Sequence, residues 1–132
     1  LGLVPAIRLN GTSDIMWEKE FPALFTNYPN VQFYDYTKIT PRMLRYCDNQ
    51  LPVNYHLTFS RSETNDSDCL DVLKERGNVA VVFRKELPKR WKRYKVYNAD
   101  TNDLRFLDKF GVAGLYAKGK AIKDNSGFVV EA

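Results

Sequence analysis

The sequence contains only two cysteines and one histidine, which leaves little room for metal or thiol chemistry. Cys47 and Cys69 lie 22 positions apart, a separation that fits no zinc or redox motif. Both fall in helical patterns, so we expect two reduced and largely buried thiols rather than a disulfide. Neither a metal site nor a cofactor is predicted.

Long apolar runs and the common nucleotide-binding and zinc-protease motifs are absent too. No stretch approaches the ~18 apolar residues of a membrane-spanning helix. No signal peptide or lipidation motif is present, so we expect a cytoplasmic protein without a membrane partner. The sequence has no P-loop, no GxGxxG and no HExxH pattern. The apolar content of 44% and charged content of 27% are instead typical of a soluble globular domain.

The length of 132 residues predicts one domain, residues 1–132. Short β-rich runs alternate with helical patterns, which predicts an α/β fold from consecutive βα units. We expect a mostly parallel sheet of about five to six strands, either a partial barrel or an open sheet. The expected strands are 6–10, 31–38, 55–60, 79–83 and 112–121, with shorter candidates at 95–97 and 128–130.

Helix signals separate these strands. Asp14 suits the N-cap of a helix beginning at Ile15, and Pro22 breaks that helix or starts a second one. The pair Thr40-Pro41 starts the next helix, which runs to about residue 48. A further helix, capped by Asn65 or Asp66, is expected to stop at Gly77. One helical turn is expected within 100–108.

Positive charge is concentrated in one segment. The net charge is +4, yet residues 84–95 (RKELPKRWKRYK) hold seven basic residues and one acidic residue, or +6, so the other 120 residues sum to −2. Such a segment suits nucleic acid or an acidic protein surface, although a solvated loop is the alternative. Trp91 and Tyr94 within it could stack on bases or anchor the loop to the core. The basic residues are Arg84, Lys85, Lys89, Arg90, Lys92, Arg93 and Lys95.

Polar residues also gather where the predicted strands end. Ligands of parallel α/β proteins bind at the carboxyl ends of the strands, so these side chains should meet on one polar rim. Cations, hydroxyls and amides in that position suit an anionic ligand such as a nucleotide or nucleic acid. The candidate ligand-binding residues are Arg8, Asn10, Ser13, Asp14, Lys38, Ser60 and Arg61.

The candidates for catalytic acid–base residues rest on weaker signals than the ligand-binding candidates. Asp35, Glu63 and the lone His56 could serve a reaction, with Asp14 beside them. The alternative for His56 is a structural role. The polar residues inside the strands equally fit a sheet with one solvent face or a simple Arg8–Asp35 pair.

Several strings have a familiar form. They are RLNGTSD (8–14), FYDYTK (33–38), NYHLTFSRSE (54–63), NVAVVF (78–83), DLRFLD (103–108) and AKGKAIKDNSGFVV (117–130). Between Ala6 and Val130 the chain thus resembles the uncharacterised gene product 88-like family of bacteriophages and mobile elements. The resemblance implies an α/β barrel whose longer members carry a cysteine-rich N-terminal segment, reminiscent of iron–sulfur radical enzymes.

This chain departs from that pattern because it begins at Leu1, just before RLNGTSD, and has no cysteine cluster. A cluster needs three or four neighbouring thiolates, which Cys47 and Cys69 cannot supply. We therefore expect the C-terminal part of the family fold, without its radical chemistry. The family motifs match the polar rim at Arg8, Asn10, Ser13, Asp14, Asp35, Lys38, Ser60, Arg61 and Glu63.

Three functions stay open on the sequence. The favoured one is a phage accessory protein that binds an anionic ligand at the polar rim and at residues 84–95. For this chain we favour binding over enzymatic activity. The second is an inhibitor of a host factor, such as a CRISPR or other defence nuclease, through protein contact. The third is a fragment of an iron–sulfur barrel enzyme. Exposed edges of an incomplete barrel would also favour a homodimer.

Overall fold

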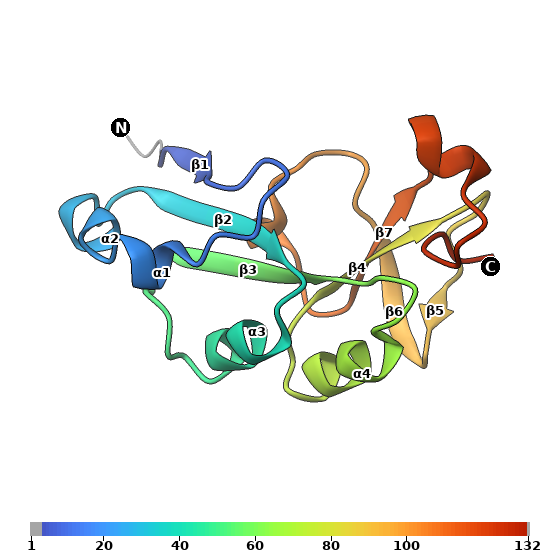
Figure 1. The fold of residues 1–132 in the computed structure, drawn as a ribbon, viewed down its shortest axis with the longest axis horizontal. Helices are drawn as coiled ribbons and strands as arrows, with labels where there is room; N and C mark the ends of the chain where they lie inside the picture. Colours follow the sequence, from blue (N-terminus) through green and yellow to red (C-terminus); the bar gives the residue numbers. More distant parts are fainter. Residues whose placement is uncertain (1–3, 132) are drawn as a thin grey trace.

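The computed structural model, which describes residues 4–131, contains one open sheet of seven strands in the order β1-β2-β3-β4-β7-β6-β5 (Figure 1). All neighbours pair in parallel except β5 and β6, which are antiparallel. The prediction of a mostly parallel α/β sheet is confirmed, and of its two alternatives the sheet is open rather than a partial barrel, with seven strands instead of five to six. The strands are β1 (Ala6–Arg8), β2 (Gln32–Thr37), β3 (Tyr55–Ser60), β4 (Val79–Phe83), β5 (Arg90–Trp91), β6 (Tyr94–Asn98) and β7 (Val112–Tyr116).

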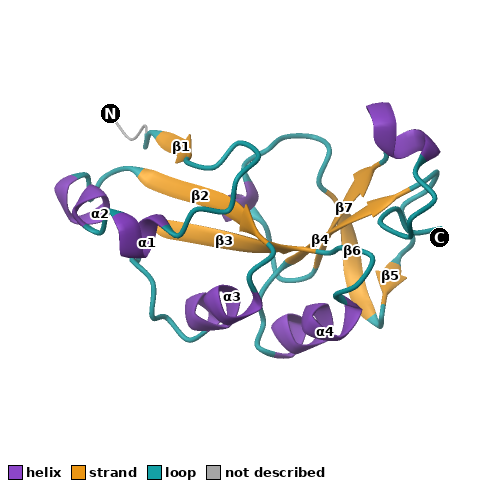
Figure 2. Ribbon diagram, in the orientation of Figure 1, coloured by secondary structure: helices purple, strands orange, loops and turns teal. Residues whose placement is uncertain are grey.

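Two helices, α3 (Thr40–Cys47) and α4 (Asp66–Lys74), cover one face of the sheet (Figure 2). Two shorter helices, α1 (Trp17–Glu20) and α2 (Ala23–Asn27), connect β1 to β2, and Pro22 separates them as predicted. The 3₁₀ helices are η1 (Arg105–Leu107) and η2 (Gly119–Lys123). None of the described helices has the length and apolarity needed to cross a membrane.

Strand alternation gives the sheet two different faces. The face under α3 and α4 is an apolar core, in which Leu57, Phe59 and Val81 pack against Met43 and Val72. The opposite face carries alanines packed with Tyr36, Tyr97 and Leu115, and η1 in the connection between β6 and β7 packs on it. The ring of Phe106 in η1 lies 5.3 Å from that of Tyr34 on this face. One face therefore supplies stability, and the other is available for a ligand.

The β3–β4 pair is strongly staggered. Only Phe59↔Val79 and Ser60↔Ala80 are in register, so the second half of β4 has no partner on the β3 side. Val130 fills this position, since its amide donates to Val82 O (2.8 Å) and its carbonyl accepts from the Arg84 amide (3.0 Å). The expected edge strand at 128–130 is thus a single bridge inside the sheet.

Three expected boundaries are wrong. β1 stops at Arg8 instead of residue 10, because the following residues turn toward α1. β7 stops at Tyr116 instead of residue 121, and Gly119 with φ +55° lies in the η2 turn that replaces the strand. α1 begins at Trp17, and Asp14 does not cap it, because the Asp14 carboxylate binds the end of β2 instead.

The α4 helix ends near the expected place for a different reason. Arg76, with φ +65°, takes the left-handed position rather than Gly77. Gly77 is needed for space, since a Cβ there would lie 2.7 Å from both Cys47 Sγ and Val72 Cγ1. Cys47 and Cys69 are free thiols, half-buried and buried, and burial raises the pKa of Cys69 to about 12.

Candidate functional site

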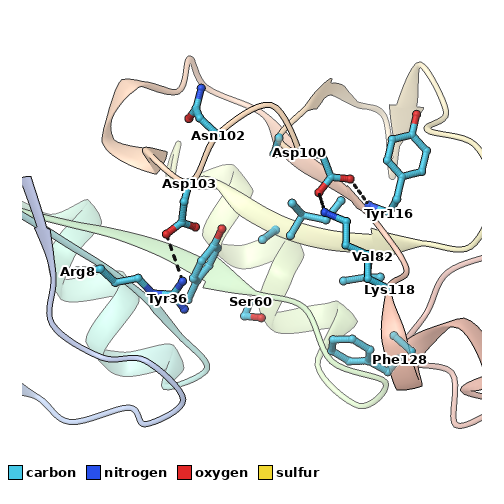
Figure 3. A pocket seen from close by; sticks show the side chains of 14 residues that line it. Arg8, Tyr36, Ser60, Val82, Asp100, Asn102, Asp103, Tyr116, Lys118 and Phe128 are labelled. Atoms are coloured by element: carbon cyan, nitrogen blue, oxygen red, sulfur yellow. Dashed lines mark hydrogen bonds and ion pairs between the residues drawn. The ribbon is translucent and has the colours of Figure 1, made fainter.

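A cleft of about 680 Å³ opens on the face opposite α3 and α4, toward the carboxyl ends of the strands (Figure 3). A smaller pocket of about 190 Å³ adjoins it and shares Arg8, Tyr36 and Ser60 with it. Strand alternation places these three side chains on the same face of the sheet. Arg8 is in register with Tyr34, which lies two positions before Tyr36. Ser60 lies two positions after Thr58, the register partner of Tyr36. The two spaces form one continuous site.

The larger compartment has a small-residue floor and hydrogen-bond acceptors on one side. Asp100, Asn102 and Asp103 come from the β6–β7 connection, and the floor consists of Ala80, Val82, Ala99 and Leu115. Asp100 accepts bonds from the Tyr116 amide and Lys118 Nζ, both at 2.8 Å. Partial burial acts to raise the pKa of Asp100, but these two donors outweigh it and the pKa lies below its usual value.

The smaller compartment is lined by hydroxyls, by the cations Arg8 and Lys38, and by the Asp14 carboxylate, which pairs with Arg42. Gly11, Thr12 and Ser13, in the loop after β1, line one side of this compartment, and Lys38 lines the other side. The Lys38 ammonium lies 5.2 Å from the ring centroid of Phe128 and forms no ion pair within residues 4–131. A cation over an aromatic ring and without a carboxylate partner is free to bind an anion.

Arg8 lies where the two compartments join. Its guanidinium carbon is 4.9 Å from the Tyr36 ring centroid, and Nη1 lies 3.3 Å from Asp103 Oδ2. Nε and Nη2 donate to the carbonyls of Asn10 (3.0 Å) and Gly11 (3.1 Å). Arg8 therefore fixes the loop after β1 and presents a partly neutralised cation to the cleft.

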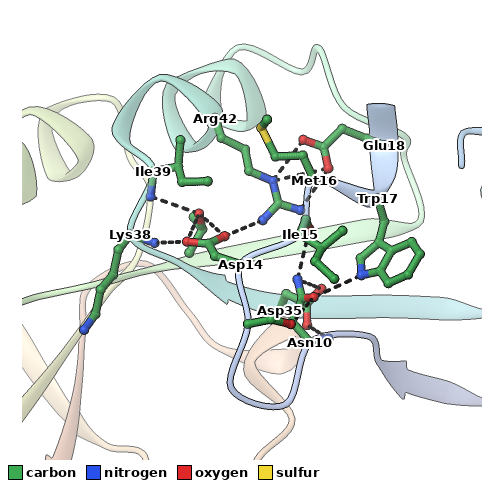
Figure 4. Close-up of polar contacts among 12 residues, drawn as sticks. Asn10, Asp14, Ile15, Met16, Trp17, Glu18, Asp35, Lys38, Ile39 and Arg42 are labelled. Atoms are coloured by element: carbon green, nitrogen blue, oxygen red, sulfur yellow. Dashed lines mark hydrogen bonds and ion pairs between the residues drawn. The ribbon is translucent and has the colours of Figure 1, made fainter. Parts of the chain in front are cut away.

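A buried network holds this loop from beneath (Figure 4). Asp35 accepts hydrogen bonds from the Asn10 amide (2.6 Å), from Asn10 Nδ2 (3.1 Å) and from the Tyr55 hydroxyl. The other side-chain atom of Asn10, Oδ1, accepts from the Ser13 hydroxyl and from Trp17 Nε1, both at 3.0 Å. Burial raises the pKa of Asp35 although these donors oppose the shift. Asp35 is thus a structural acceptor under the site.

Arg42 is the centre of the second half of the network. Its side chain is fully buried and donates to Glu18 Oε1 at 2.8 Å, to Asp14 Oδ1 at 3.0 Å and to the Tyr55 hydroxyl at 2.7 Å. Asp14 also accepts from the Thr37 hydroxyl (2.8 Å) and the Lys38 amide (2.7 Å). These contacts tie α1, β2, α3 and β3 together, and they place the Lys38 backbone at the cleft.

Six of the seven predicted ligand-binding residues line this site, as the polar-rim argument expected. They are Arg8, Asn10, Ser13, Asp14, Lys38 and Ser60. Arg61 lies elsewhere: Nε donates to Asp66 (2.8 Å) and Nη1 to the carbonyls of Gly127 (2.6 Å) and Phe128 (2.7 Å). Arg61 therefore holds the C-terminal segment against β3.

The three acid–base candidates do not converge. Asp35 faces the core under α3, whereas Arg8 lies on the opposite face, so the two do not pair. Glu63 is exposed beside Gly127 and does not line the cleft. His56 lines a separate cavity of about 530 Å³, where its ring packs edge-on at 5.5 Å from Tyr46. Burial and the charge of Arg105 lower the pKa of His56 to about 4.

The basic segment does not line the cleft either. Arg84 donates to the carbonyls of Ile122 and Asp124 and pairs with Glu131, so it binds the C-terminal segment, and Lys85 is exposed after β4. Of the remaining five residues, Lys89 directly precedes β5 and the other four lie on β5, β6 and the turn between them, next to α4. Figure 1 shows this hairpin on the side of α4, away from the loop after β1. Trp91 is buried, so it anchors the hairpin.

Sequence reasoning missed the acceptor side of the cleft. Asp100, Asn102 and Asp103 lie in a long connection that has no periodic pattern, and Lys118 was assigned to a strand. Among the cleft residues that were missed, Tyr36 could have been found from the sequence, since it follows Asp35 in a strand and must lie on the opposite face of the sheet. In the described part of the chain, no group of three or more His, Cys, Asp or Glu side chains could hold a metal ion.

The comparisons with known proteins give one finding. A protein-family model described as Gene product 88 matches residues 2–132. No curated protein and no solved structure matches the chain.

Proposed function

The chain belongs to the gene product 88 family of phage gene products, and from this premise and the geometry of its cleft we propose that it binds a nucleoside phosphate. One observation carries the proposal: the smaller compartment contains Lys38 and hydroxyls beside an Asp14 carboxylate that Arg42 neutralises, and the larger one has an apolar floor with acceptors, of which Asp100 binds Lys118. Arg8, Tyr36 and Ser60 form the boundary that both compartments share.

The two compartments correspond to the two halves of such a ligand. Phosphate oxygens suit the Lys38 ammonium, the Arg8 guanidinium and the Thr12 hydroxyl, whereas the Ser13 hydroxyl already donates to Asn10 Oδ1. A base suits the small-residue floor beside the Tyr36 ring, because every base has an aromatic face that stacks. The larger compartment, at about 680 Å³, lies within the range of about 300–1,000 Å³ for small-ligand sites, and the smaller one adds about 190 Å³ beside it.

The acceptors of the larger compartment supply the specificity. Asp100, Asn102 and Asp103 can accept hydrogen bonds from sugar hydroxyls or from the amino group of a base. Asp103 also competes with a phosphate for Arg8, at 3.3 Å. We assign no reaction, since Asp35, Glu63 and His56 lie in three different places.

The test is a titration by calorimetry with the four nucleoside 5′-monophosphates, the matching nucleosides and inorganic phosphate. We expect at least one monophosphate to bind, and its nucleoside to bind more weakly. Lys38→Ala should weaken the monophosphate about tenfold to a hundredfold, since hydrogen bonds to charged groups contribute about 1.5–3 kcal/mol. Lys38 is chosen because Arg8 also supports the loop.

Lys19→Ala is the matched control. Lys19 is an exposed lysine of α1 and lines neither compartment, so its removal should leave the affinity unchanged. Equal affinity for a nucleoside and its monophosphate would contradict the phosphate assignment. Absence of binding by every monophosphate at millimolar concentration would contradict the whole proposal.

A further inference from the structure

The hairpin formed by β5 and β6 has an unusual turn. Trp91 pairs with Tyr94, and Lys92 and Arg93 alone connect them, with φ values of 50° and 77°. Two-residue hairpin turns with both φ values positive favour Asn-Gly, because a side chain in the left-handed region is unfavourable. A lysine followed by an arginine is therefore a poor choice for the turn, and a strained position of this kind can indicate function.

The hairpin tip is nevertheless held firmly. Trp91 is 8% exposed and belongs to the main core, and the Tyr94 ring packs edge-on against Phe110 at 5.9 Å. Arg90 Nη1 donates to the Arg93 carbonyl (3.0 Å), which closes the turn. The turn side chains are thus carried on an anchored support rather than on a loose loop.

The charges at the tip are exposed and largely unpaired. Within residues 4–131, its one ion pair joins Lys92 to Asp66 at 3.6 Å. No large hydrophobic side chain is exposed between positions 89 and 95. We call this surface the basic tip; its exposed cations are Lys89, Arg90, Lys92, Arg93 and Lys95.

We propose that the basic tip binds the phosphate backbone of nucleic acid. Protein interfaces depend on buried aromatic and apolar side chains at their centre, which the basic tip does not offer. Binding to a phosphate backbone requires only positioned lysines and arginines, which it does offer. A two-stranded ribbon is also a shape that the major groove of DNA admits.

This site is independent of the cleft. The basic tip adjoins α4, where Lys74, Lys92 and Arg93 line a groove of about 320 Å³, and none of its residues lines either compartment of the cleft. A protein with both sites would hold a nucleoside phosphate on the face of the sheet opposite α3 and α4, and a nucleic acid at the β5–β6 hairpin.

The test measures fluorescence anisotropy with a 20-base-pair duplex of random sequence at several salt concentrations. Five phosphate contacts would give a slope of log K against log salt of about −4.5. Lys92→Asn with Arg93→Gly removes two cations and installs the favoured turn residues. We expect the slope to become shallower by about 2 and the affinity at low salt to fall at least tenfold, while the melting temperature stays equal or rises.

The control is Lys19→Asn with Lys123→Asn, which removes the same two charges from exposed positions outside the tip. It should keep the affinity within about threefold. Three results would overturn the proposal: no binding to the duplex at low salt, equal binding by the turn variant, or loss of duplex binding in Lys38→Ala with the turn variant unaffected. The last result would move nucleic-acid binding to the cleft.

Discussion

Replacing Arg42 with methionine should unfold the support of the cleft. Arg42 is fully buried and connects Asp14 and Glu18, which lie in the segment between β1 and β2, to Tyr55 in β3. Methionine keeps an apolar stem, carries no charge and does not reach the position of the guanidinium, so it removes every one of these hydrogen bonds. The burial of the partners then decides the size of the effect.

The Glu18 side chain is 7% exposed and that of Asp14 is 28% exposed. Without Arg42, the Glu18 carboxylate stays buried with no cation. Removing one partner of a buried ion pair costs about 3–5 kcal/mol. With an unfolding entropy of about 2.1 cal/mol/K per residue, this loss lowers the melting temperature of the 132-residue chain by roughly 10–18 °C.

Urea unfolding and thermal melting followed by circular dichroism give the comparison. Arg45→Met on the same helix is the control, because within residues 4–131 the Arg45 side chain has one hydrogen-bond contact, to Met16 Sδ at 3.9 Å, and its loss should change stability by less than about 1 kcal/mol. Adding Glu18→Gln to Arg42→Met should cost less than the sum of the two single changes, since no unpaired charge is left. Equal stability of Arg42→Met and Arg45→Met would refute the reasoning.

Two further predictions concern stability. Burial lowers the pKa of His56 from 6.5 to about 4, so the unfolded chain binds a proton at His56 more tightly than the folded chain does. The folded state therefore loses stability as the pH falls from about 6.5 to 4. His56→Gln should remove this loss, which is on the order of 3 kcal/mol, in urea titrations at pH 4.5 and 7; a persistent slope would implicate other groups. Gly77→Ala should lower the free energy of unfolding by about 1–3 kcal/mol, because the added Cβ would lie 2.7 Å from Cys47 Sγ. At Gly11 an added Cβ meets no atom within 4 Å, so Gly11→Ala should leave the free energy of unfolding nearly unchanged in the same urea titration.

The polar rim was predictable because it depends only on chain direction. Once the strands are parallel, the residues that follow each of them meet at one edge, so Ser13, Lys38 and Ser60 were expected together and lie together. Which face of the sheet each strand residue occupies was harder to predict from the sequence. Arg8 and Asp35 both occupy strand regions, yet the register pairs Arg8 with Tyr34 and thereby separates Arg8 from Asp35.

The supporting network was not visible in the sequence. Arg42 occupies an ordinary position in a helix, and its partners Asp14 and Glu18 lie 28 and 24 residues away. Asp14 has a good capping residue type, but a buried guanidinium and the end of β2 compete for its carboxylate. The hairpin was missed for a related reason, since Lys92 and Arg93 give no turn signal.

The most direct test of the proposed function is an NMR titration of the ¹⁵N-labelled chain with a nucleoside monophosphate that binds in calorimetry. The proposal predicts that amide shifts concentrate in both compartments, at Thr12, Ser13, Lys38 and Ser60 on one side and at Asp100 and Asn102 on the other. Inorganic phosphate should move only the first group. Shifts confined to the basic tip, with the cleft unchanged, would contradict the assignment of the cleft as the nucleotide site.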